Sequence, residues 1–278
     1  MEKIVLSPSR VRRWIRCKKS YYWRYYQHLV RVEKETAPTL GLVVGKALAD
    51  YYCEGDRNQS LLDKSLESSL NHYKFRPEVD TKLAKDWAKV TRVSKHLLST
   101  YHEWASSRDD FKVIHVETPQ QVELTPYVSL LAIPDTIVKV DSEDNLVLEH
   151  KVRYRYRPGD FGIDYQSVGS CLVSNSIGTL YNVLEYGKLK LHRELIVRSS
   201  YELDYFRDIF IHIGEDILST PPEELYPQPF KRCSCEYWEL CNGEMMGIDV
   251  DNIISELYQK SVRPREIKEE SNGKEGGE

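Results

Sequence analysis

The sequence predicts a mixed α/β protein whose first portion is mainly helical and whose central portion is a sheet. Through much of the first hundred residues, apolar side chains recur every three to four positions, which is the spacing of a helix with one face on a core. From Phe111 the apolar residues instead form short runs rich in Val, Ile and Leu between turn residues, which is typical of strands. Helical patterns then return among further strands, so helices are expected to pack on a sheet.

Helical segments are expected before residue 110. In the first, Ser7 is a candidate N-cap and Pro8 suits the first helical position, and the long pattern that follows contains no Gly or Pro. This segment predicts one helix, or two closely joined helices, over 6–29. Three more helices are predicted over 41–52, 60–73 and 82–105.

Strands follow the helical portion. Consecutive strands of one sheet are predicted over 111–117, 120–125, 127–140 and 145–151. A helix over 160–177, a strand pair around Gly187 and a helix over 201–218 come next.

Length and composition indicate a soluble globular protein, because 278 residues with 41% hydrophobic and 29% charged side chains are enough for a sizeable core. We interpret residues 1–262 as one domain and expect the polar tail over 263–278 to be disordered. Within the domain, the helical portion covers 1–110, the sheet core 111–220 and a cysteine-bearing segment 221–247.

No apolar run approaches the roughly 20 residues needed to cross a bilayer, and the first residues lack the apolar stretch and cleavage site of a secretory signal. A cytoplasmic protein without membrane contact is therefore expected. In such a reducing compartment, clustered thiols are more often metal ligands than disulfides. Cys53 and Cys171 lie apart from the other cysteines, and we interpret them as buried, unligated thiols.

Charge gives a local rather than a global indication of a nucleic-acid partner. The net charge is −4, but the N-terminal segment mixes basic and aromatic side chains, which suits phosphates and stacked bases. These residues are Arg10, Arg12, Arg13, Trp14, Arg16, Lys18, Lys19, Tyr21, Tyr22, Trp23, Arg24, Tyr25 and Tyr26. A helix with a solvated basic side and an aromatic core side explains the same pattern, and we favour that interpretation.

Two carboxylates and a lysine form the candidate site. Residues two apart in a strand project from the same face, so Glu149 and Lys151 are expected to stand together. Antiparallel pairing through the turn DSEDN would bring Asp135 to the same end of the sheet. Hard divalent ions such as Mg2+ prefer carboxylate oxygens, and a nearby lysine can orient or deprotonate a water and offset phosphate charge. The grouping therefore points to phosphodiester hydrolysis.

A simple ion pair at a charged sheet edge also produces the pattern Glu-x-Lys, and this alternative stays open. Asp135 weakens it, because Asp135 follows Pro134 inside an apolar run, where burial of a lone acid is costly without a partner or a metal.

These residues resemble a known family. Pro134-Asp135, thirteen intervening residues and Glu149-His150-Lys151 are similar to the central signature of the PD-(D/E)XK nuclease superfamily, and within it of RecB-like exonucleases, which include AddB-type, CRISPR-associated and many phage proteins. The resemblance implies a restriction-endonuclease-like fold, with a mixed central sheet flanked by helices and a C-terminus joined to the N-terminal region by a metal cluster.

The resemblance also implies a function. The expected protein is a DNA exonuclease that depends on Mg2+ or Mn2+ and acts on DNA that is single-stranded or has free ends. It would serve DNA repair or recombination, phage replication or CRISPR adaptation in the cytoplasm of a bacterium, an archaeon or a phage-infected host. The resemblance names no protein partner.

Residue roles follow from the same resemblance. Asp135 and Glu149 would bind the metal, His150 would add its backbone carbonyl, and Lys151 would serve the attacking water. Gln166 falls where the family has a helix with Gln-x-x-x-Tyr, a pattern associated with DNA contact near the metal. An exposed polar residue of a helix explains Gln166 equally well.

Two positions depart from the family pattern. Ser170 stands where the tyrosine is expected, and Gly45 stands where the segment Gly-x-x-x-His-x-x-Leu carries a histidine that commonly ligates the metal. A water can replace that ligand, since Mg2+ normally keeps several waters. These departures leave open a second function, a catalytically weakened or inactive nucleic-acid-binding module of the same fold.

Four cysteines form a further candidate site. Iron-sulfur members of the family hold a [4Fe-4S] cluster with one N-terminal cysteine and a C-terminal trio, roles that would fall on Cys17 and on Cys233, Cys235 and Cys241. The trio here is Cys-x-Cys-x5-Cys, one residue shorter than usual, so a zinc ion held by the same thiolates stays open. A protein-interaction scaffold with structural zinc is the third functional hypothesis.

Overall fold

The computed structural model describes residues 3–32, 39–73, 81–140, 144–227, 233 and 235–261. The chain divides into two compact units. Unit 1 comprises Met1–Arg12 and Glu35–Ser219, and unit 2 comprises Arg13–Lys34 and Thr220–Glu278. The organisation of 1–262 as one nuclease domain stays a prediction, and the expected disordered tail lies outside the described residues.

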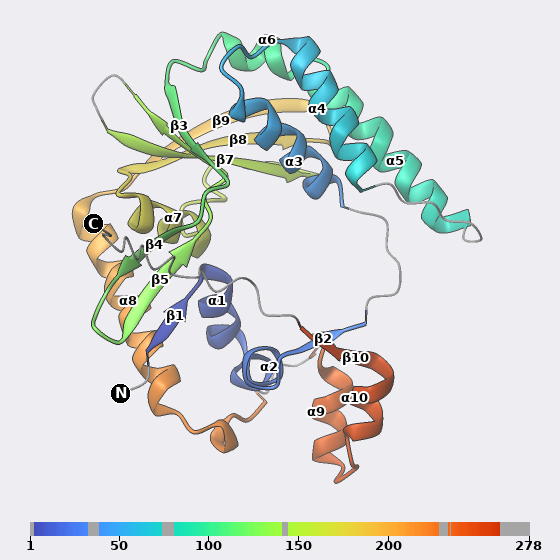
Figure 1. The fold of residues 1–278 in the computed structure, drawn as a ribbon, viewed down its shortest axis with the longest axis vertical. Coiled ribbons are helices and arrows are strands. Elements are labelled where there is room, and N and C mark those ends of the chain that lie inside the picture. Colours follow the sequence, from blue (N-terminus) through green and yellow to red (C-terminus); the bar gives the residue numbers. More distant parts are fainter. Residues whose placement is uncertain are drawn as a thin grey trace, which may run out of the picture. The chain divides into compact units, whose positions relative to one another are not determined.

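Unit 1 confirms the mixed α/β prediction with a five-stranded sheet in the order β3-β6-β7-β8-β9 (Figure 1). The strands are β3 (Lys112–Val116), β6 (Thr136–Lys139), β7 (Asn145–Arg153), β8 (Gly178–Glu185) and β9 (Lys190–Val197). β7 and β8 run parallel, whereas the other neighbours are antiparallel. Parallel neighbours need a crossover, and helix α7 (Tyr165–Ser174) lies in it.

A second sheet corrects the expectation of a single one. β1 (Ile4–Leu6), β5 (Val128–Ala132) and β4 (Gln120–Glu123) form a three-stranded sheet in the order β1-β5-β4. The run predicted as one strand over 127–140 is divided between the two sheets at Ile133-Pro134-Asp135. Pro134 has no N–H to donate to a ladder, so the strand ends there and the chain can change sheets.

Helices pack on the five-stranded sheet. α3 (Leu40–Cys53) packs on β3 and β7, and α7 packs on β7 and β8. α4 (Gln59–His72) and α5 (Thr81–Leu98) pack on α3, α6 (Tyr101–Ser106) packs on α4 and α5, and α8 (Ser200–Ser219) packs on α7. The Thr39 and Asn58 side chains cap α3 and α4, as the sequence chemistry favours. Val44 and Leu48 of α3 share one buried core with Val138 and Leu148 of the sheet. The predicted helix over 82–105 is interrupted between α5 and α6.

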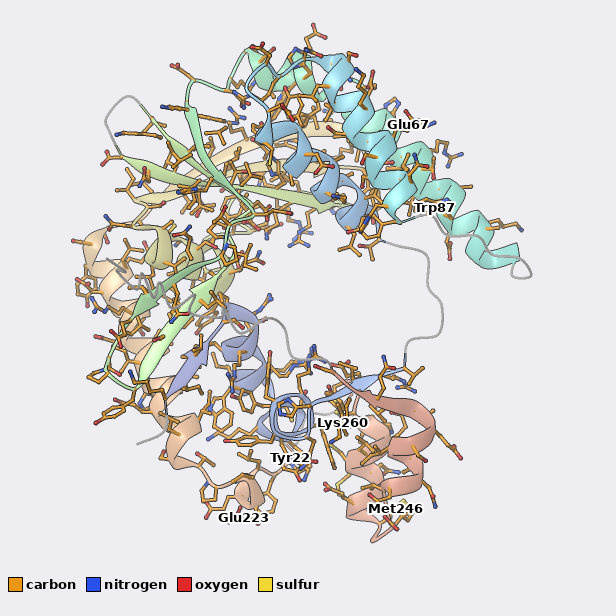
Figure 2. The ribbon with its side chains drawn as sticks, in the orientation of Figure 1. Tyr22, Glu67, Trp87, Glu223, Met246 and Lys260 are labelled. Atoms are coloured by element: carbon orange, nitrogen blue, oxygen red, sulfur yellow. The ribbon has the colours of Figure 1, made fainter. Side chains whose placement is uncertain are left out.

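Unit 2 combines an N-terminal segment, Arg13–Lys34, with the C-terminal segment Thr220–Glu278. Its N-terminal part contains the end of α1 (Pro8–Arg16), α2 (Lys18–Tyr21), a π-helical turn (Tyr22–Tyr26) and β2 (Leu29–Arg31). Its C-terminal part contains a 3-10 turn (Pro222–Glu224), α9 (Trp238–Met245), α10 (Asp251–Leu257) and β10 (Tyr258–Lys260). β10 pairs antiparallel with β2, and the Tyr237 hydroxyl donates to the Leu29 carbonyl at 2.7 Å. Figure 2 labels Tyr22, Met246 and Lys260 in this unit.

The first predicted segment is thus two closely joined helices with a π-helical extension, which confirms one of the two expected forms. Over the described ranges, every helix is too short or too polar to cross a bilayer.

Candidate active site

The β6–β7 ladder places Asp135 beside the middle of β7. Thr136 pairs with Leu148, so the residue before β6 meets β7 just beyond Leu148, and the predicted antiparallel pairing is confirmed. There the Asp135 Oδ2 atom accepts a hydrogen bond from the backbone N–H of His150 at 2.9 Å. The N–H and C=O of one strand residue face the same neighbouring strand, so the His150 carbonyl also projects toward this edge.

Glu149, Lys151 and Gln166 form a closed set of contacts. The Lys151 ammonium donates to Glu149 Oε1 at 2.6 Å and to Gln166 Oε1 at 3.3 Å, and Gln166 Nε2 donates to Glu149 Oε1 at 3.0 Å. Gln166 lies in the first turn of α7, where Asp164 acts as N-cap and accepts its backbone N–H at 3.0 Å. The sheet face and the helix start therefore bring together side chains that are seventeen residues apart.

The two carboxylate oxygens of Glu149 differ in their surroundings. The Glu149 side chain is 2% exposed, and its buried Oε2 atom makes no hydrogen bond within the described part of the chain. Burial raises the pKa of Glu149 and the negative charge of Asp135 raises it further, whereas Lys151 lowers it. Burial also raises the pKa of Asp135, against the opposing effects of the His150 N–H and of Lys151. One lysine does not compensate both carboxylates.

Oxygen donors of this kind fit a hard divalent cation. Among the described residues, no three His, Cys, Asp or Glu side chains converge as a ready metal site. The donors are two carboxylates, from Asp135 and Glu149, with the His150 carbonyl on the same edge. Mg2+ is commonly held by one or two carboxylates, with waters and substrate phosphates completing its shell. A cation here would also give the orphan Oε2 atom of Glu149 a partner.

Comparison with known proteins identifies the family. A family model described as the PD-(D/E)XK nuclease superfamily matches residues 5–242. The chain belongs to the PD-(D/E)XK nuclease superfamily. Membership supports a nuclease with a nucleic-acid substrate and a divalent metal such as Mg2+ or Mn2+, and the mixed sheet with flanking helices agrees with the superfamily's restriction-endonuclease-like fold.

A search of curated proteins finds no match. Among solved structures, the chain is similar to one described as "Crystal structure of SSO0001", at 12% sequence identity and a TM-score of 0.30, over 74% of this chain and 85% of that chain.

The position of the family histidine falls on Gly45, in the middle of α3. A Cβ atom placed on Gly45 would have no atom within 4 Å, so a side chain has room there. α3 packs on β3 and β7. Lys46, the next residue of the helix, lies close enough to Glu117 for its positive charge to lower the pKa of that carboxyl.

Glu117 is a neighbour of the site that the sequence did not single out. Its N–H donates to the Asp135 carbonyl at 3.0 Å, and its φ of 43° is left-handed, which is uncommon for a residue with a side chain. Burial and the charge of Asp135 raise the pKa of Glu117, and Lys46 lowers it. A charge at the end of a strand is too common in sequences to have indicated this contact.

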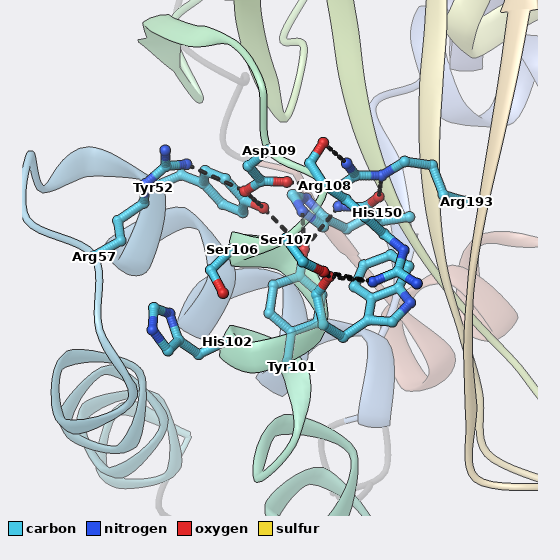
Figure 3. A network of polar contacts seen from close by, with 12 residues as sticks. Tyr52, Arg57, Tyr101, His102, Ser106, Ser107, Arg108, Asp109, His150 and Arg193 are labelled. Atoms are coloured by element: carbon cyan, nitrogen blue, oxygen red, sulfur yellow. Dashed lines mark hydrogen bonds and ion pairs between the residues drawn. The ribbon is translucent and has the colours of Figure 1, made fainter.

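The His150 side chain enters a buried polar network (Figure 3), and its Nδ1 atom lies 3.9 Å from Asp135 Oδ2. It is 4% exposed, and its Nε2 atom lies 3.1 Å from the Tyr101 hydroxyl. That hydroxyl accepts a hydrogen bond from Asn182 Nδ2 at 2.8 Å. Burial, followed by the positive charges of Arg193 and Lys151, lowers the pKa of His150 to about 3, so the imidazole is neutral.

Asp109 is the anionic centre of the same network. Its Oδ1 atom accepts from Arg193 at 2.6 Å, and its Oδ2 atom accepts from the Tyr52 hydroxyl at 2.8 Å and from Arg57 at 3.4 Å. Arg193 also donates to Asn182 Oδ1 at 2.8 Å. The network therefore ties α3, α6, β8 and β9 to the strand that carries the candidate site.

A polar cleft opens beside Lys151 and Gln166. It has a volume of about 360 Å3. Its lining residues are Arg12, Lys151, Arg153, Asp160, Phe161, Ile163, Asp164 and Gln166. Arg12 belongs to the basic N-terminal segment, but neither it nor Arg153 carried a sequence signal that linked it to Lys151.

The four candidate cluster cysteines all belong to unit 2. Cys17 is buried and its Sγ atom accepts the Ser20 N–H at 3.4 Å, while the Sγ atoms of Cys233 and Cys235 lie 3.6 Å apart. Burial raises the pKa values of Cys235 and Cys241, and neighbouring thiols add to the effect, Cys233 on Cys235 and Cys17 on Cys241.

The other two cysteines differ from each other. Cys171 is buried as expected, and its thiol lies 3.4 Å from the Thr179 hydroxyl. The interpretation of Cys53 as buried was wrong: it is exposed, because it is the last residue of α3 and its side chain lies outside the helix's buried face.

Proposed function

We propose that this protein is a RecB-like DNA exonuclease that depends on Mg2+ or Mn2+ and acts on DNA that is single-stranded or has free ends. The observation that carries the proposal is the convergence of Asp135 and Glu149 beside Lys151, with one buried carboxylate oxygen of Glu149 lacking a partner among the described residues. Two acids and a lysine at one strand edge suit phosphodiester hydrolysis.

Each side chain has a distinct task in this reaction. Asp135, Glu149 and the His150 carbonyl would hold the divalent ion, which when bound polarises a phosphate oxygen and lowers the pKa of a water. Lys151 has three N–H donors and uses two of them on Glu149 and Gln166. The third is available to orient the attacking water or to offset charge on the phosphate. Gln166 fixes the rotamer of Lys151 from the side of α7.

The cleft supports a nucleic-acid strand as substrate. Arg12 and Arg153 line it together with Lys151, and guanidinium groups match phosphate oxygens in geometry and charge. Such contacts position the backbone without reading base sequence, which agrees with an enzyme that degrades DNA without sequence preference.

A weakened or inactive nucleic-acid-binding module is the second candidate, and two observations favour it. Gly45 supplies no imidazole, and Ser170, in the position of the family tyrosine, is 1% exposed and cannot reach a substrate. The same fold would then bind DNA without turnover.

We also propose that Cys17, Cys233, Cys235 and Cys241 hold a [4Fe-4S] cluster, because four thiols of the expected kind lie in one unit. Zinc stays the alternative. The separation of 3.6 Å between the Cys233 and Cys235 Sγ atoms is close to the ~3.8 Å expected between two thiolates on one tetrahedral zinc with Zn–S bonds of about 2.3 Å.

Cleavage of end-labelled DNA tests the leading proposal. Wild-type protein is expected to shorten single-stranded or duplex DNA from its ends with Mn2+ or Mg2+, and Glu149→Ala and Lys151→Ala are each expected to slow this by at least about 100-fold. Glu215→Ala is the matched control, since Glu215 is an exposed acid on α8. Cleavage that survives both site variants would contradict the proposal.

Binding without cleavage would favour the second candidate. If the wild-type protein binds DNA tightly but shows no divalent-dependent cleavage at any pH, the inactive module is supported. Cuts within a circular strand would replace the exonuclease assignment with an endonuclease.

A further inference from the structure

The chain leaves the candidate site through an alternating run of arginine and tyrosine. Residues 153–157 read RYRYR and begin two positions after Lys151. Arg153, Arg155 and Arg157 are all exposed. Within the described part of the chain, none of the three guanidinium groups makes a hydrogen bond or an ion pair. This segment, which we call the arginine–tyrosine segment, therefore carries three guanidinium groups without an anionic partner in the described residues, of which Arg153 lies over the Phe161 ring at 5.9 Å.

Two arginines near this sheet are paired with carboxylates. Arg193 bonds Asp109 and Arg198 bonds Glu202, so the fold neutralises guanidinium groups that serve its own structure. Unpaired arginines grouped on one short segment are available to an external anion.

The segment is held firmly by one of its tyrosines. The Tyr156 hydroxyl donates to Glu194 Oε2 at 2.8 Å, and its ring stacks on Phe161 at 6.3 Å between centroids. The Gly159 N–H donates to the other oxygen of Glu194 at 2.9 Å, and the Gly187 N–H donates to the Tyr154 carbonyl at 3.0 Å. These contacts fix the backbone before any ligand arrives.

Tyr154 is displayed rather than buried. Its side chain is 69% exposed and meets Tyr186 edge-on, with centroids 5.4 Å apart. An edge contact leaves a ring face free, and a free aromatic face beside basic groups is a stacking platform for a base.

The segment is continuous with the catalytic cleft. Arg153 lines the cleft with Lys151 and Gln166, and Ile163 on the same cleft is 79% exposed. Asp160 and Asp164 also line it, so the lining carries three cationic side chains, from Arg12, Lys151 and Arg153, against two carboxylates.

We propose that the arginine–tyrosine segment binds single-stranded DNA and feeds it to the candidate site. Arg155 and Arg157 contact successive phosphates, Arg153 continues the track into the cleft, and Tyr154 stacks on an unpaired base. Phosphate contacts alone would serve a duplex equally well. Tyr154 favours a single strand, because stacking on its ring needs an exposed base face and the faces of duplex bases are covered by their neighbours. This inference rests on the proposed nuclease function and names the substrate form that the site receives.

Measurements of DNA affinity under conditions that prevent cleavage test the inference. Fluorescence anisotropy of a labelled 20-nucleotide single strand and of its duplex, without added divalent metal, reports affinity at several salt concentrations. The variants are Arg155→Ala/Arg157→Ala, Tyr154→Ala and Tyr154→Phe. Arg207→Ala and Tyr205→Ala are matched controls, since both residues are exposed on α8.

The charge and stacking variants have different expected signatures. Loss of two phosphate contacts lowers the slope of log affinity against log salt by about 1.4, at about 0.7 per contact for a single strand. Tyr154→Ala weakens single-strand binding at least about fivefold with an unchanged slope, and Tyr154→Phe retains most of the affinity. The two α8 variants bind as the wild type does.

Three outcomes overturn the inference: wild-type slope in the double arginine variant, equal affinity of Tyr154→Ala and wild type, or tighter binding of the duplex. Each is distinguishable from failure of the proposed function. That failure appears as absence of metal-dependent cleavage in the wild type, whereas these measurements require no cleavage.

Discussion

Glu149 is buried and, in the described part of the chain, carries an unsatisfied carboxylate oxygen, and both features lower the stability of the fold. It is buried to 2% exposure, and one carboxylate oxygen has no partner within the described residues. Burying a charge without full compensation costs free energy, and natural proteins keep such arrangements where chemistry needs them. Lys151 offsets part of this cost through a contact of 2.6 Å with Glu149 Oε1.

The stability of the metal-free protein is expected to fall with rising pH because of Glu149. Its pKa is raised in the folded state above 4.5, so between 4.5 and the raised value the folded state holds a proton that the unfolded state has lost. Stability from this group is therefore present at low pH and is lost as pH rises through the folded-state pKa. Urea unfolding across this range should show the decline, and Glu149→Gln should flatten it. An unchanged slope in that variant would assign the decline to other groups.

Gly45→His is expected to strengthen metal binding. The position has open space, and removal of a group that merely orients a ligand costs 10- to 100-fold in affinity, so an added imidazole ligand should gain at least about tenfold for Mn2+. Isothermal titration measures this gain.

Gly45→Ala separates metal binding from helix stability. Alanine should stabilise α3 by about 0.5–1 kcal/mol without the affinity gain, because glycine weakens a helix interior. Equal Mn2+ affinity in the two variants would show that position 45 does not face the metal.

Among the elements, β7 carries most of the site and depends on what lies behind it. One of its faces presents Glu149 and Lys151, and the other presents His150 to the buried network of Tyr101, Asn182 and Asp109 (Figure 3). The sequence predicted this alternation, because successive strand residues face opposite ways. It did not predict the network, whose members come from four other elements and share no spacing.

Asp109→Asn is expected to destabilise the fold strongly. The carboxylate is 5% exposed and bonds two partly buried arginines and a tyrosine, so its loss leaves their positive charge uncompensated, at a cost of about 3 kcal/mol. Chemical denaturation measures the loss. Glu123→Gln is the control, because the pair with Lys3 is exposed and its loss should cost less than about 1 kcal/mol. Similar small losses in both variants would mean that the network is not stabilising.

At the scale of the molecule, the chain forms two units that each combine distant segments. Unit 2 combines residues 13–34 with residues 220–278. The family resemblance implies a metal cluster that links these same two segments. Its described apolar core includes Trp23, Leu29 and Tyr237, so side-chain packing also contributes to holding the two segments together.

Anaerobic metal analysis is expected to find iron and labile sulfide in unit 2. Cys235→Ser should lose both, because a cluster needs all four thiolates, and Cys53→Ser should keep them, since Cys53 is an exposed thiol of unit 1. A colourless protein with zinc would contradict the cluster and support the tetrahedral alternative.

The sequence by itself determined the local features of this protein. Helical period, strand alternation and the caps depend on neighbours along the chain, and so does the juxtaposition of Glu149 and Lys151, which are two residues apart. The family was also readable, because its signature is short and local. Tertiary structure alone decided what depends on distant contacts. It divided the predicted sheet in two at Pro134, brought Arg12 to the cleft, left Glu149 Oε2 without a partner among the described residues and exposed Tyr154. Burial and charge compensation are properties of packed neighbours, and spacing along the chain does not contain them.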